Sequence, residues 1–284
     1  MQGTPPVPGT GQVPGTPLSP RNRRVRDLVA LARRPAERRA RGIYIVEGPK
    51  LVSAALQSSA ELDELFVSAD EEGSVVVQRL VGEATERGVD VQVLSGAAFE
   101  RVSDARSPRG ILATCRRLPF GEGHALEPGW PFVIVCTGVA DPGNMGALLR
   151  VAAASGAGAL VVCDAAVDPY GPKAVRASGG AVFSIPVVEL ETPEEALQMV
   201  HHAGMISVGT VPRGGLPYDE VSWEDRFALF VGSEGAGLGA GVESRMDVKV
   251  SIPMQADVES LNVAAAAAIV AFEAARRRRR SGGG

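Results

Sequence analysis

Three turns, two of them rich in glycine, carry most of the side chains in this sequence that could do chemistry. The first turn runs from Thr137 to Arg150 (TGVADPGNMGALLR), and the second runs from Phe230 to Gly241 (FVGSEGAGLGAG). The third turn begins at Ser251 (SIPMQADVESLNVAAAAAIV). Glycines let backbone approach a ligand closely, and the helix that follows such a turn offers unpaired N–H groups. The three turns therefore predict a ligand site built largely from backbone.

Each turn also contributes a few polar side chains. Asn144 and Arg150 are six residues apart, which places them on different helical faces unless Asn144 lies in the loop, as the neighbouring Pro-Gly suggests. On spacing alone Arg150 would be an ordinary helix-surface arginine. Glu234 follows an apolar strand and could orient a ligand or a polar neighbour. Ser260 is well placed as a helix N-cap, and Asn262 follows at the start of that helix.

The first turn also admits a dinucleotide-binding interpretation. Asp164 follows the next strand, roughly where a ribose-binding acid would sit. However, the glycines stand at positions 138, 143 and 146, which is not the G-x-G-x-x-G spacing. A nicotinamide-dependent oxidoreductase would also need a hydride-transfer partner. It is the less favoured alternative, and a cofactor titration would separate it from the others.

Alternating apolar strands and helices must position these turns. Near-continuous apolar strands separated by helices predict an α/β fold with a largely parallel sheet covered on both faces. Because each turn follows a strand, all three should meet at the carboxyl edge of the sheet, where ligands bind. The expected strands are 132–136, 159–162, 185–188, 206–209, 227–231 and 248–252, with helices at 145–155 and from Leu261 to the final arginines.

The chain in front of this sheet divides into three parts. Residues 1–20 are rich in Pro, Gly and Thr and predict a disordered tail. Residues 21–117 again alternate helices and strands, which indicates a small α/β domain. Residues 118–131 (LPFGEGHALEPGWP) lose periodicity and form the expected linker to the second domain, 132–284. The strands expected in the first domain are 43–46, 65–67, 89–94 and 110–114, with helices at 49–57 and 75–87 and a basic helix in front.

Composition limits the compartment and the cofactor class. No apolar run approaches the roughly 20 residues that span a bilayer, and the N-terminus lacks a signal-peptide pattern, so we expect a cytoplasmic protein with no membrane partner. Cys115, Cys136 and Cys163 show no C-x-x-C spacing and are expected to be core thiols. With only three histidines in the chain, no metal site is expected.

Local charge permits a nucleic-acid partner although the formal net charge is −4. Between Arg21 and Arg41, nine arginines stand against two carboxylates, which gives a local charge of +7. Binding of phosphate depends on the local field, although a solvated basic helix is the other interpretation. A second cluster, residues 276–280, ends the last helix, where cations suit the helix dipole. The expected nucleic-acid contacts are Arg21, Arg23, Arg24, Lys50 and Arg109, and binding through them should weaken with salt.

The three turns resemble a known family. The segments DPGNMGALLRVAAASG, VGSEGAGL and SIPM…SLNVAAAAAI, in this order, resemble the motifs of the SpoU (TrmH) RNA 2′-O-ribose methyltransferases over about residues 131–275. In front, IYIVEGPKLVSAAL, ELFVS and SPRGILATC resemble the family's substrate-binding domain. The resemblance implies a C-terminal trefoil-knotted SPOUT methyltransferase domain of the α/β class, behind a small N-terminal α/β domain similar to RNA-binding ribosomal proteins.

The same resemblance implies the site residues. By motif, the catalytic residues would be Asn144, Arg150, Glu234, Ser260 and Asn262. Backbone around the second and third motifs would hold the methyl donor, S-adenosyl-L-methionine, without a metal. The cofactor-binding residues would be Gly232, Ile252 and Leu261, with Thr210 and Met254 as further candidates. The family often has Gly two places after the Met of IPM, whereas this chain has Ala256, which would stiffen the cofactor loop.

The implied reaction is in-line attack of a ribose 2′-hydroxyl on the sulfonium methyl group. Arg150 is the family's proposed base, but a free guanidinium is protonated at ordinary pH. Holding the target phosphate and stabilising the developing alkoxide is an equally physical role, with Asn144 positioning Arg150 or the ribose. The implied assembly is a homodimer packed through the knot, and the implied substrate is 23S ribosomal RNA.

Two alternatives to the ribosomal substrate remain open. One is methylation of transfer RNA. The other is a non-catalytic RNA-binding or ribosome-assembly protein on the same fold, which would be expected to have lost Asn144, Arg150 or Glu234, all of which are present. The resemblance also extends to relatives that protect ribosomes from thiopeptide antibiotics, so a role in resistance stays open.

Overall fold

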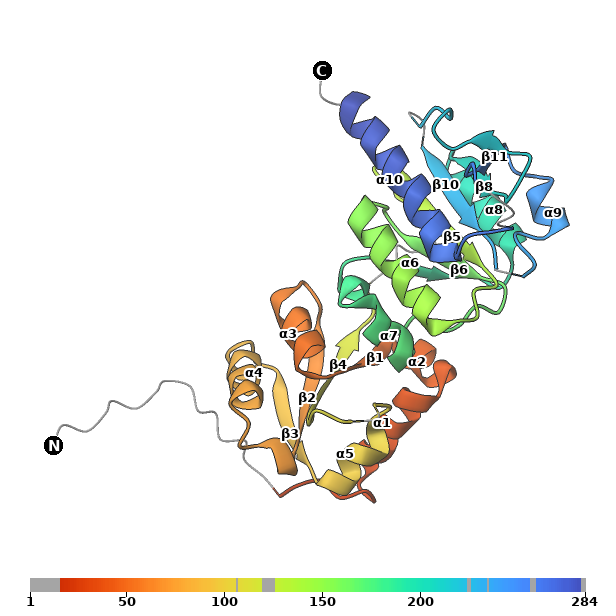
Figure 1. Ribbon diagram of the computed structural model, residues 1–284. Helices are drawn as coiled ribbons and strands as arrows, with labels where there is room; N and C mark the ends of the chain where they lie inside the picture. Colours follow the sequence, from red (N-terminus) through yellow and green to blue (C-terminus); the bar gives the residue numbers. More distant parts are fainter. Residues whose placement is uncertain are drawn as a thin grey trace. The chain divides into compact units, whose positions relative to one another are not determined.

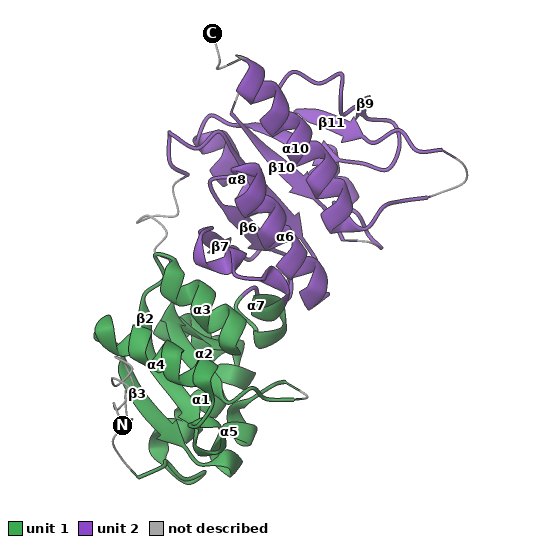
Figure 2. Ribbon diagram, turned by 60° about the vertical axis from the view of Figure 1, so that its left-hand side comes forward, with its two compact units in different colours: residues 1–117, 170–176 green, residues 118–169, 177–284 purple. Residues whose placement is uncertain are grey.

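Two compact units make up the chain. The computed structural model describes residues 16–105, 107–118, 126–223, 226–233, 235–255 and 259–281. Unit 1 consists of residues 1–117 and 170–176, and unit 2 consists of residues 118–169 and 177–284 (Figure 2). The predicted domain bounds placed 170–176 in the second domain, whereas these residues belong to unit 1. Residues 119–125 of the predicted linker lie outside the described residues.

Unit 1 is built on a mixed four-stranded sheet (Figure 1). The strand order is β1-β4-β2-β3, in which β4 runs antiparallel to both β1 and β2, and β2 runs parallel to β3. Since β1 and β4 are antiparallel, the end of β1 lies opposite the start of β4. The strands are β1 (Ile43–Glu47), β2 (Leu62–Ser68), β3 (Asp90–Leu94) and β4 (Ile111–Arg116).

Five α-helices and one 3-10 helix pack around this sheet. Asn22 caps the first helix by accepting a hydrogen bond from the Arg24 backbone N–H at 2.9 Å. The same helix buries Val25, Leu28 and Leu31, whose spacing of three makes one apolar face. The fifth helix is too short to show a clear period, and the sequence did not predict it. The helices are α1 (Arg23–Arg33), α2 (Pro35–Arg41), α3 (Pro49–Gln57), α4 (Val75–Glu86), α5 (Gly96–Val102) and the 3-10 helix η1 (Ala69–Glu71).

The predicted disordered tail is wrong at its C-terminal end. Its residues 1–15 lie outside the described residues. Leu18, however, bridges to Leu94 of β3: its N–H donates to the Val93 carbonyl at 2.8 Å, and its carbonyl accepts from the Ser95 N–H at 3.0 Å. Its side chain packs against the core of unit 1. A single leucine in a Pro-rich segment gives no periodic signal, so the sequence could not show this pairing.

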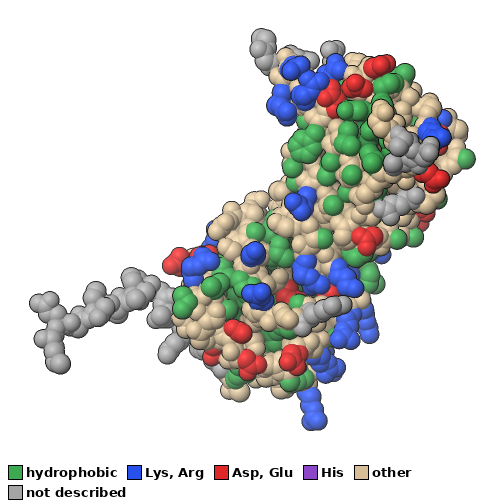
Figure 3. All heavy atoms as spheres, in the orientation of Figure 1, with side chains coloured by type: hydrophobic (Ala, Val, Ile, Leu, Met, Phe, Trp, Pro, Cys, Tyr) green, Lys and Arg blue, Asp and Glu red, His purple; other side chains and the backbone are tan. Residues whose placement is uncertain are grey.

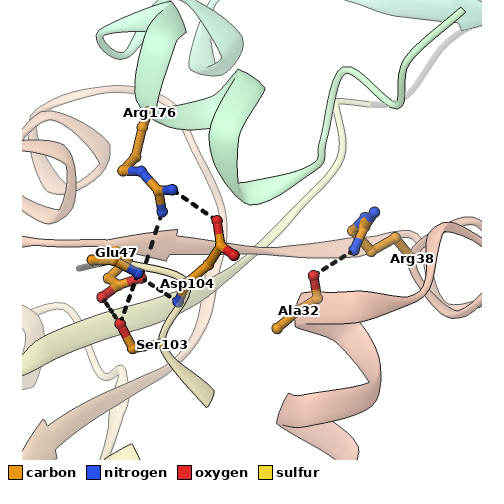
Figure 4. Close-up of polar contacts among 7 residues, drawn as sticks. Ala32, Arg38, Glu47, Ser103, Asp104 and Arg176 are labelled. Atoms are coloured by element: carbon orange, nitrogen blue, oxygen red, sulfur yellow. Dashed lines mark hydrogen bonds and ion pairs between the residues drawn. The ribbon is translucent and has the colours of Figure 1, made fainter. Parts of the chain in front are cut away.

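A buried carboxylate is the centre of a polar cluster in unit 1 (Figure 4). Glu47 ends β1, and its side chain is only 6% exposed. It accepts hydrogen bonds from the Ser103 hydroxyl and from the Asp104 backbone N–H at 3.3 Å. Arg176 forms ion pairs with Glu47 at 3.7 Å and with Asp104 at 2.8 Å. Arg176 thus compensates the charge of the Glu47 carboxylate, which would otherwise be buried without a partner.

The basic segment at the start of unit 1 is not uniformly exposed. Arg38 is buried, and its guanidinium donates to the carbonyls of Leu31 and of Ala32, the latter at 3.2 Å, near the end of α1 (Figure 4). These carbonyls are among those that a helix end leaves without intrahelical partners. One of the nine arginines counted in the sequence therefore holds the fold instead of facing solvent.

Unit 2 is built on a parallel sheet of seven strands. The order is β7-β6-β5-β10-β8-β11-β9, and every neighbouring pair is parallel, which confirms the predicted sheet. The central strands are buried along their whole length, as expected when helices cover both faces. The strands are β5 (Phe132–Thr137), β6 (Leu160–Cys163), β7 (Val187–Glu189), β8 (Ile206–Thr210), β9 (Leu216–Pro217), β10 (Phe227–Val231) and β11 (Val248–Ser251).

Helices cover the two faces of this sheet (Figure 1). α6 and α10 pack against each other on one face. α8 buries Ala196, Leu197 and Val200 against the strand residues of the other face. α7 belongs to unit 1 as far as Arg176 and to unit 2 from Ala177 onwards. The helices are α6 (Pro142–Ser155), α7 (Pro172–Ser178), α8 (Pro193–His202), α9 (Ala240–Glu243), α10 (Val263–Ser281) and the 3-10 helix η3 (Ala181–Phe183).

The three cysteines are buried free thiols, as predicted. Burial raises the pKa of the Cys115 thiol to about 12, and that of Cys163 likewise to about 12. They are therefore protonated, unreactive parts of the core at ordinary pH. Among the described helices, none combines the length and the apolar character needed to cross a membrane.

Candidate active site

The first predicted turn leads directly into α6. Asp141 caps this helix, with its Oδ1 accepting from the Asn144 backbone N–H at 2.8 Å, and Pro142 occupies the first helical position. Asn144 therefore lies in the first turn of the helix, and the expectation that it lies in the loop is wrong. The Asp-Pro start signal outweighs the glycine at 143. Arg150 is exposed and stands about 120° around the helix from Asn144.

The third turn leads into α10 in the same way. Asn262 is its N-cap, because its Oδ1 accepts from the backbone N–H groups of Ala264 at 3.0 Å and Ala265 at 3.3 Å. The expectation that Ser260 caps this helix is therefore wrong. The Asn262 Nδ2 donates to Asn144 Oδ1 at 2.8 Å. One side-chain hydrogen bond thus joins the starts of α6 and α10, which are far apart in the sequence.

A cavity of about 190 Å³ opens beside this pair at the carboxyl ends of β8, β10 and β11. All five residues predicted to bind the cofactor line it: Thr210, Gly232, Ile252, Met254 and Leu261. Ser260, predicted as catalytic, lines it as well. Most of the remaining wall is apolar and was not predicted, and it includes Val231, Val250, Val263, Ala266 and Val270.

Close backbone packing shapes the wall at the second turn. Ser233 and Gly237 exchange two backbone hydrogen bonds, at 3.0 and 3.1 Å, and fold this turn back on itself. A Cβ on Gly232 would lie 2.1 Å from the Gly237 carbonyl carbon, so only glycine fits there. The turn itself contains Glu234, which lies outside the described residues, as does Ala256 of the third turn.

A second cavity, of about 250 Å³, adjoins the first. Three residues line both cavities: Ser233, Gly235 and Val263. The second cavity also contains Asn144 and the helix cap Asp141, together with Gly138 at the end of β5. We call the first the apolar cavity and the second, after the side chains of Asp141, Asn144 and Ser233, the polar cavity, although apolar atoms make up most of both walls.

Arg150 is a predicted catalytic residue that lies outside this arrangement. Of the described residues, those lining the two cavities do not include it. The sequence in turn missed Asp141 and Ser233. Asp141 could have been found as an N-cap before proline, and Ser233 as the residue following the close-packed glycine.

The residues predicted to contact RNA lie in unit 1 and are exposed. Arg24 is engaged in ion pairs with Glu64 at 2.8 Å and Asp90 at 3.7 Å. Lys50 follows the end of β1, and Arg109 precedes the start of β4, so antiparallel pairing puts both at one end of this sheet. Their contacts with RNA stay a prediction.

Comparison with known proteins gives this arrangement a family. The model of the SpoU rRNA Methylase family matches residues 131–272, and that of the MRM3-like substrate binding domain matches residues 22–113. The chain belongs to the SpoU rRNA methylase family. The first match covers both cavities described above, and the second covers most of unit 1.

Individual relatives of this SpoU chain align with it over most of their length. It is 32% identical over 246 residues to the 23S rRNA (guanosine(2553)-2′-O)-methyltransferase RlmP of Bacillus subtilis, covering 87% of this chain and 93% of that one. It is 29% identical to the 23S rRNA (uridine(2479)-2′-O)-methyltransferase of Streptomyces viridochromogenes, covering 87% of each. The structure of the SpoU methyltransferase AviRb from S. viridochromogenes with AdoMet matches at a TM-score of 0.78 and 28% identity, over 91% of this chain and 99% of that one.

These matches confirm several predictions. The family and the SPOUT methyltransferase fold with an N-terminal substrate-binding domain are confirmed. S-adenosylmethionine (AdoMet) is the cofactor of this family, which confirms the predicted cofactor. The trefoil knot stays a prediction.

Proposed function

We propose that this SpoU chain transfers a methyl group from S-adenosylmethionine to a ribose 2′-oxygen of 23S ribosomal RNA. The observation that carries the proposal is the pair of adjoining cavities, the second of which is lined by Asn144, whose side chain is held by the hydrogen bond from Asn262. Two adjoining compartments suit a reaction that brings two substrates together. Both relatives described above are named as 23S rRNA 2′-O-methyltransferases.

The apolar cavity fits the adenosine of the donor. Val231, Val250 and Ile252 offer aliphatic surface to a base, and the glycine turn places backbone N–H and C=O groups within reach of its polar edge. The Thr210 hydroxyl already donates a hydrogen bond to the Phe230 carbonyl at 3.0 Å. Thr210 would therefore shape the wall of the cavity and would not donate a hydrogen bond to S-adenosylmethionine. When bound, S-adenosylmethionine supplies an electrophilic methyl group on a sulfonium.

The polar cavity would take the target ribose. Transfer would form a bond between its 2′-oxygen and the methyl carbon as the sulfur–carbon bond breaks, so that S-adenosylhomocysteine would leave and the hydroxyl proton would pass to solvent water. Asn144 and Asn262 fix each other's amide orientation, so they present defined donors and acceptors to the sugar.

We further propose that the enzyme is a homodimer in the cytoplasm. The last helix carries an apolar stripe at the spacing i, i+3, i+4 and i+7, in which Ala265 and Phe272 are exposed and Ala268 and Ile269 are half-buried. Phe272 is 43% exposed, and Figure 3 shows hydrophobic side chains gathered over α10. Such a stripe on a helix that already buries its opposite side is suited to a partner.

Dimerisation would also give Arg150 a role. In its own chain this residue lies away from Asn144 and from the described cavity walls. We propose that Arg150 serves the site of the second protomer, where a guanidinium would hold the target phosphate through two parallel hydrogen bonds. This role needs no deprotonation, in contrast to a general base.

Unit 1 would supply the RNA-binding surface. On α1, Arg23, Arg26 and Arg33 lie on the side opposite the buried Val25 and Leu28, and Figure 3 shows basic side chains over this part of unit 1. Arg23→Ala should weaken RNA binding and lower the slope of log affinity against log salt by about 1. Arg79→Ala is the matched control, since Arg79 lies on α4, is paired with Glu83 and is not a predicted RNA contact, and filter binding at several salt concentrations would compare the two.

The proposed function is tested by transfer of labelled methyl from S-adenosylmethionine to unmodified 23S rRNA, transfer RNA and ribosomal particles. We expect label in one ribosomal RNA position, detected as a block to alkaline cleavage. Arg150→Ala should abolish transfer while the Kd for S-adenosylmethionine stays unchanged. Label only in transfer RNA would replace the substrate, and donor binding without transfer to any RNA would favour a non-catalytic RNA-binding protein.

A further inference from the structure

A carboxylate outside the assigned motifs lies beside the polar cavity. Asp164 directly follows β6, and its Oδ2 lies 3.4 Å from the position that a Cβ on Gly138 would take. Gly138 lines the cavity at the end of β5. The Ser233 Cβ lies 3.5 Å from the same point. Because β5 stands between β6 and β10 in the sheet, Asp164 and Ser233 flank Gly138 from its two neighbouring strands.

The backbone at this corner adopts a conformation that L-residues rarely take. Asp164 has φ +60° and Ala165 has φ +51°, and they are the two non-glycine residues with positive φ in the described chain. Such a conformation costs free energy and often marks a functional site. The Asp164 backbone N–H is held by the Glu191 carbonyl at 3.2 Å. Within the described residues its side chain has no hydrogen-bond or ion-pair partner, and it is exposed.

The order of strands decides which part of a substrate this carboxylate can meet. The apolar cavity, which we propose holds the methyl donor and call the donor cavity from here on, lies over β8, β10 and β11, and Ser233 and Val263 are shared between it and the polar cavity. Asp164 lies on the other side of the polar cavity, over β6. A ribose that offers its 2′-oxygen to the donor side would therefore direct another part of its nucleotide towards Asp164. A phosphate there would be repelled, so the base is the part that a carboxylate can hold.

We propose that Asp164 is a specificity-determining residue that accepts hydrogen bonds from the base of the target nucleotide and selects guanine. This inference rests on the proposed function. An ionised carboxylate is purely an acceptor with two oxygens, and guanine is the base whose Watson–Crick edge offers two adjacent N–H donors, N1–H and N2–H. Uracil offers one N–H between two carbonyl oxygens, and cytosine and adenine place a ring nitrogen acceptor beside their amino group, so each would repel one carboxylate oxygen.

The test uses the full chain, unmodified 23S rRNA and labelled S-adenosylmethionine, with the RNA digested to nucleosides after reaction. Wild type should yield 2′-O-methylguanosine. Asp164→Asn should lower the kcat/KM for this product by about tenfold to hundredfold, since one N–H would then face the amide NH₂. Asparagine tolerates a left-handed backbone, so this variant should fold. Its Kd for S-adenosylmethionine should match wild type.

A pair of glycine variants separates the carboxylate from the backbone. Asp164→Gly and Ala165→Gly each relieve one left-handed residue and should raise the midpoint of thermal unfolding. Asp164→Gly should lose transfer as Asp164→Asn does, whereas Ala165→Gly keeps the carboxylate and should stay within about twofold of wild type.

The outcomes are distinguishable. A wild-type product other than 2′-O-methylguanosine, or full transfer by Asp164→Asn, would overturn the role of Asp164 and leave the methyltransferase standing. Equal loss in Ala165→Gly and Asp164→Gly would also overturn it, because the backbone would then be the cause. Absence of any transfer by wild type would overturn the proposed function and this inference with it.

Discussion

Glu47 in unit 1 ends a buried strand and Asn144 in unit 2 lies in the first turn of the helix that follows one, yet their surroundings differ. Glu47 is almost fully buried and is held by a hydroxyl, a backbone N–H and the Arg176 guanidinium. Asn144 stays partly accessible in the wall of a cavity and meets Asn262, which is exposed. Burial with complete pairing produces a structural group. Accessibility with a fixed orientation leaves hydrogen-bonding capacity for a substrate.

Replacing Asn262 should give the sharpest view of the accessible pair. Asn262→Asp keeps an oxygen that can cap α10 but removes the Nδ2 donor to Asn144, so we expect kcat to fall about 100-fold with little change in stability. Asn262→Ala should show the same fall in kcat and, because the helix cap is lost, should also be less stable by about 1 kcal/mol. Methyl-transfer kinetics and thermal unfolding would measure both. A wild-type rate for Asn262→Asp would show that the amide pair is structural, like Glu47.

Gly232→Ala tests the backbone wall of the donor cavity. The added Cβ would meet the Gly237 backbone at 2.1 Å, so the second turn must move. We expect the Kd for S-adenosylmethionine to rise about 30-fold, or ~2 kcal/mol, as in other overpacked sites. Gly241→Ala is the matched control, because a Cβ there meets no described atom within 4 Å and Gly241 lines neither cavity. Calorimetric titration would compare them, and equal losses would point to chain flexibility instead of packing.

Arg176→Met tests the buried side of the comparison. It removes the ion pair with Glu47, although Ser103 and Asp104 still donate to that carboxylate. Unit 1 should lose about 1.5 kcal/mol of stability, while the donor cavity of unit 2 should keep its Kd for S-adenosylmethionine. Arg176→Lys keeps the charge and should lose less. Thermal unfolding would measure the stability, and titration with S-adenosylmethionine would measure binding in unit 2. A weaker Kd for S-adenosylmethionine would contradict a purely structural role of Arg176.

The smallest expected effect lies at the opposite edge of the sheet in unit 2. Asp247, just before β11, accepts from the Ser207 N–H at 2.8 Å and the Ser207 hydroxyl at 2.6 Å, with His201 Nε2 at 3.2 Å. Partial burial raises the pKa of Asp247, but the hydrogen bonds from Ser207 and His201 outweigh this and hold the pKa below its ordinary value. The folded state therefore favours the charged form.

The sign of the pH dependence follows from that lowered pKa. The stabilisation by Asp247 is fully present above the unfolded-state pKa of about 3.9, and it is lost as pH falls through the lower folded-state value. Asp247→Asn should cost about 0.5 kcal/mol at pH 7, and its stability should fall less than that of wild type below pH 4. Urea unfolding from pH 7 to pH 2.5 would measure this. Identical pH profiles would show that Asp247 contributes nothing.

Local signals in the sequence predicted where the candidate site lies. The apolar strands at 132–136 and 227–231 and the glycines after them predicted a parallel sheet with a ligand edge, because strand and turn preferences act over a few residues. The resemblance to the SpoU family then predicted five cofactor-binding residues, and all of them line one cavity. The cap of α6 at Asp141 was readable from the Asp-Pro pair, although it was missed.

Tertiary structure decided what no local pattern contains. The Asn262–Asn144 hydrogen bond joins residues that are 118 positions apart in the sequence. Residues 170–176 belong to unit 1 because Tyr170 contacts Tyr44 and Arg117 there and Arg176 pairs with Glu47. Position of Asp164 beside Gly138 depends on β6 being the neighbour of β5. Sequence determines local backbone preference and burial pattern, whereas partners distant along the chain are fixed only when the strands pack in order.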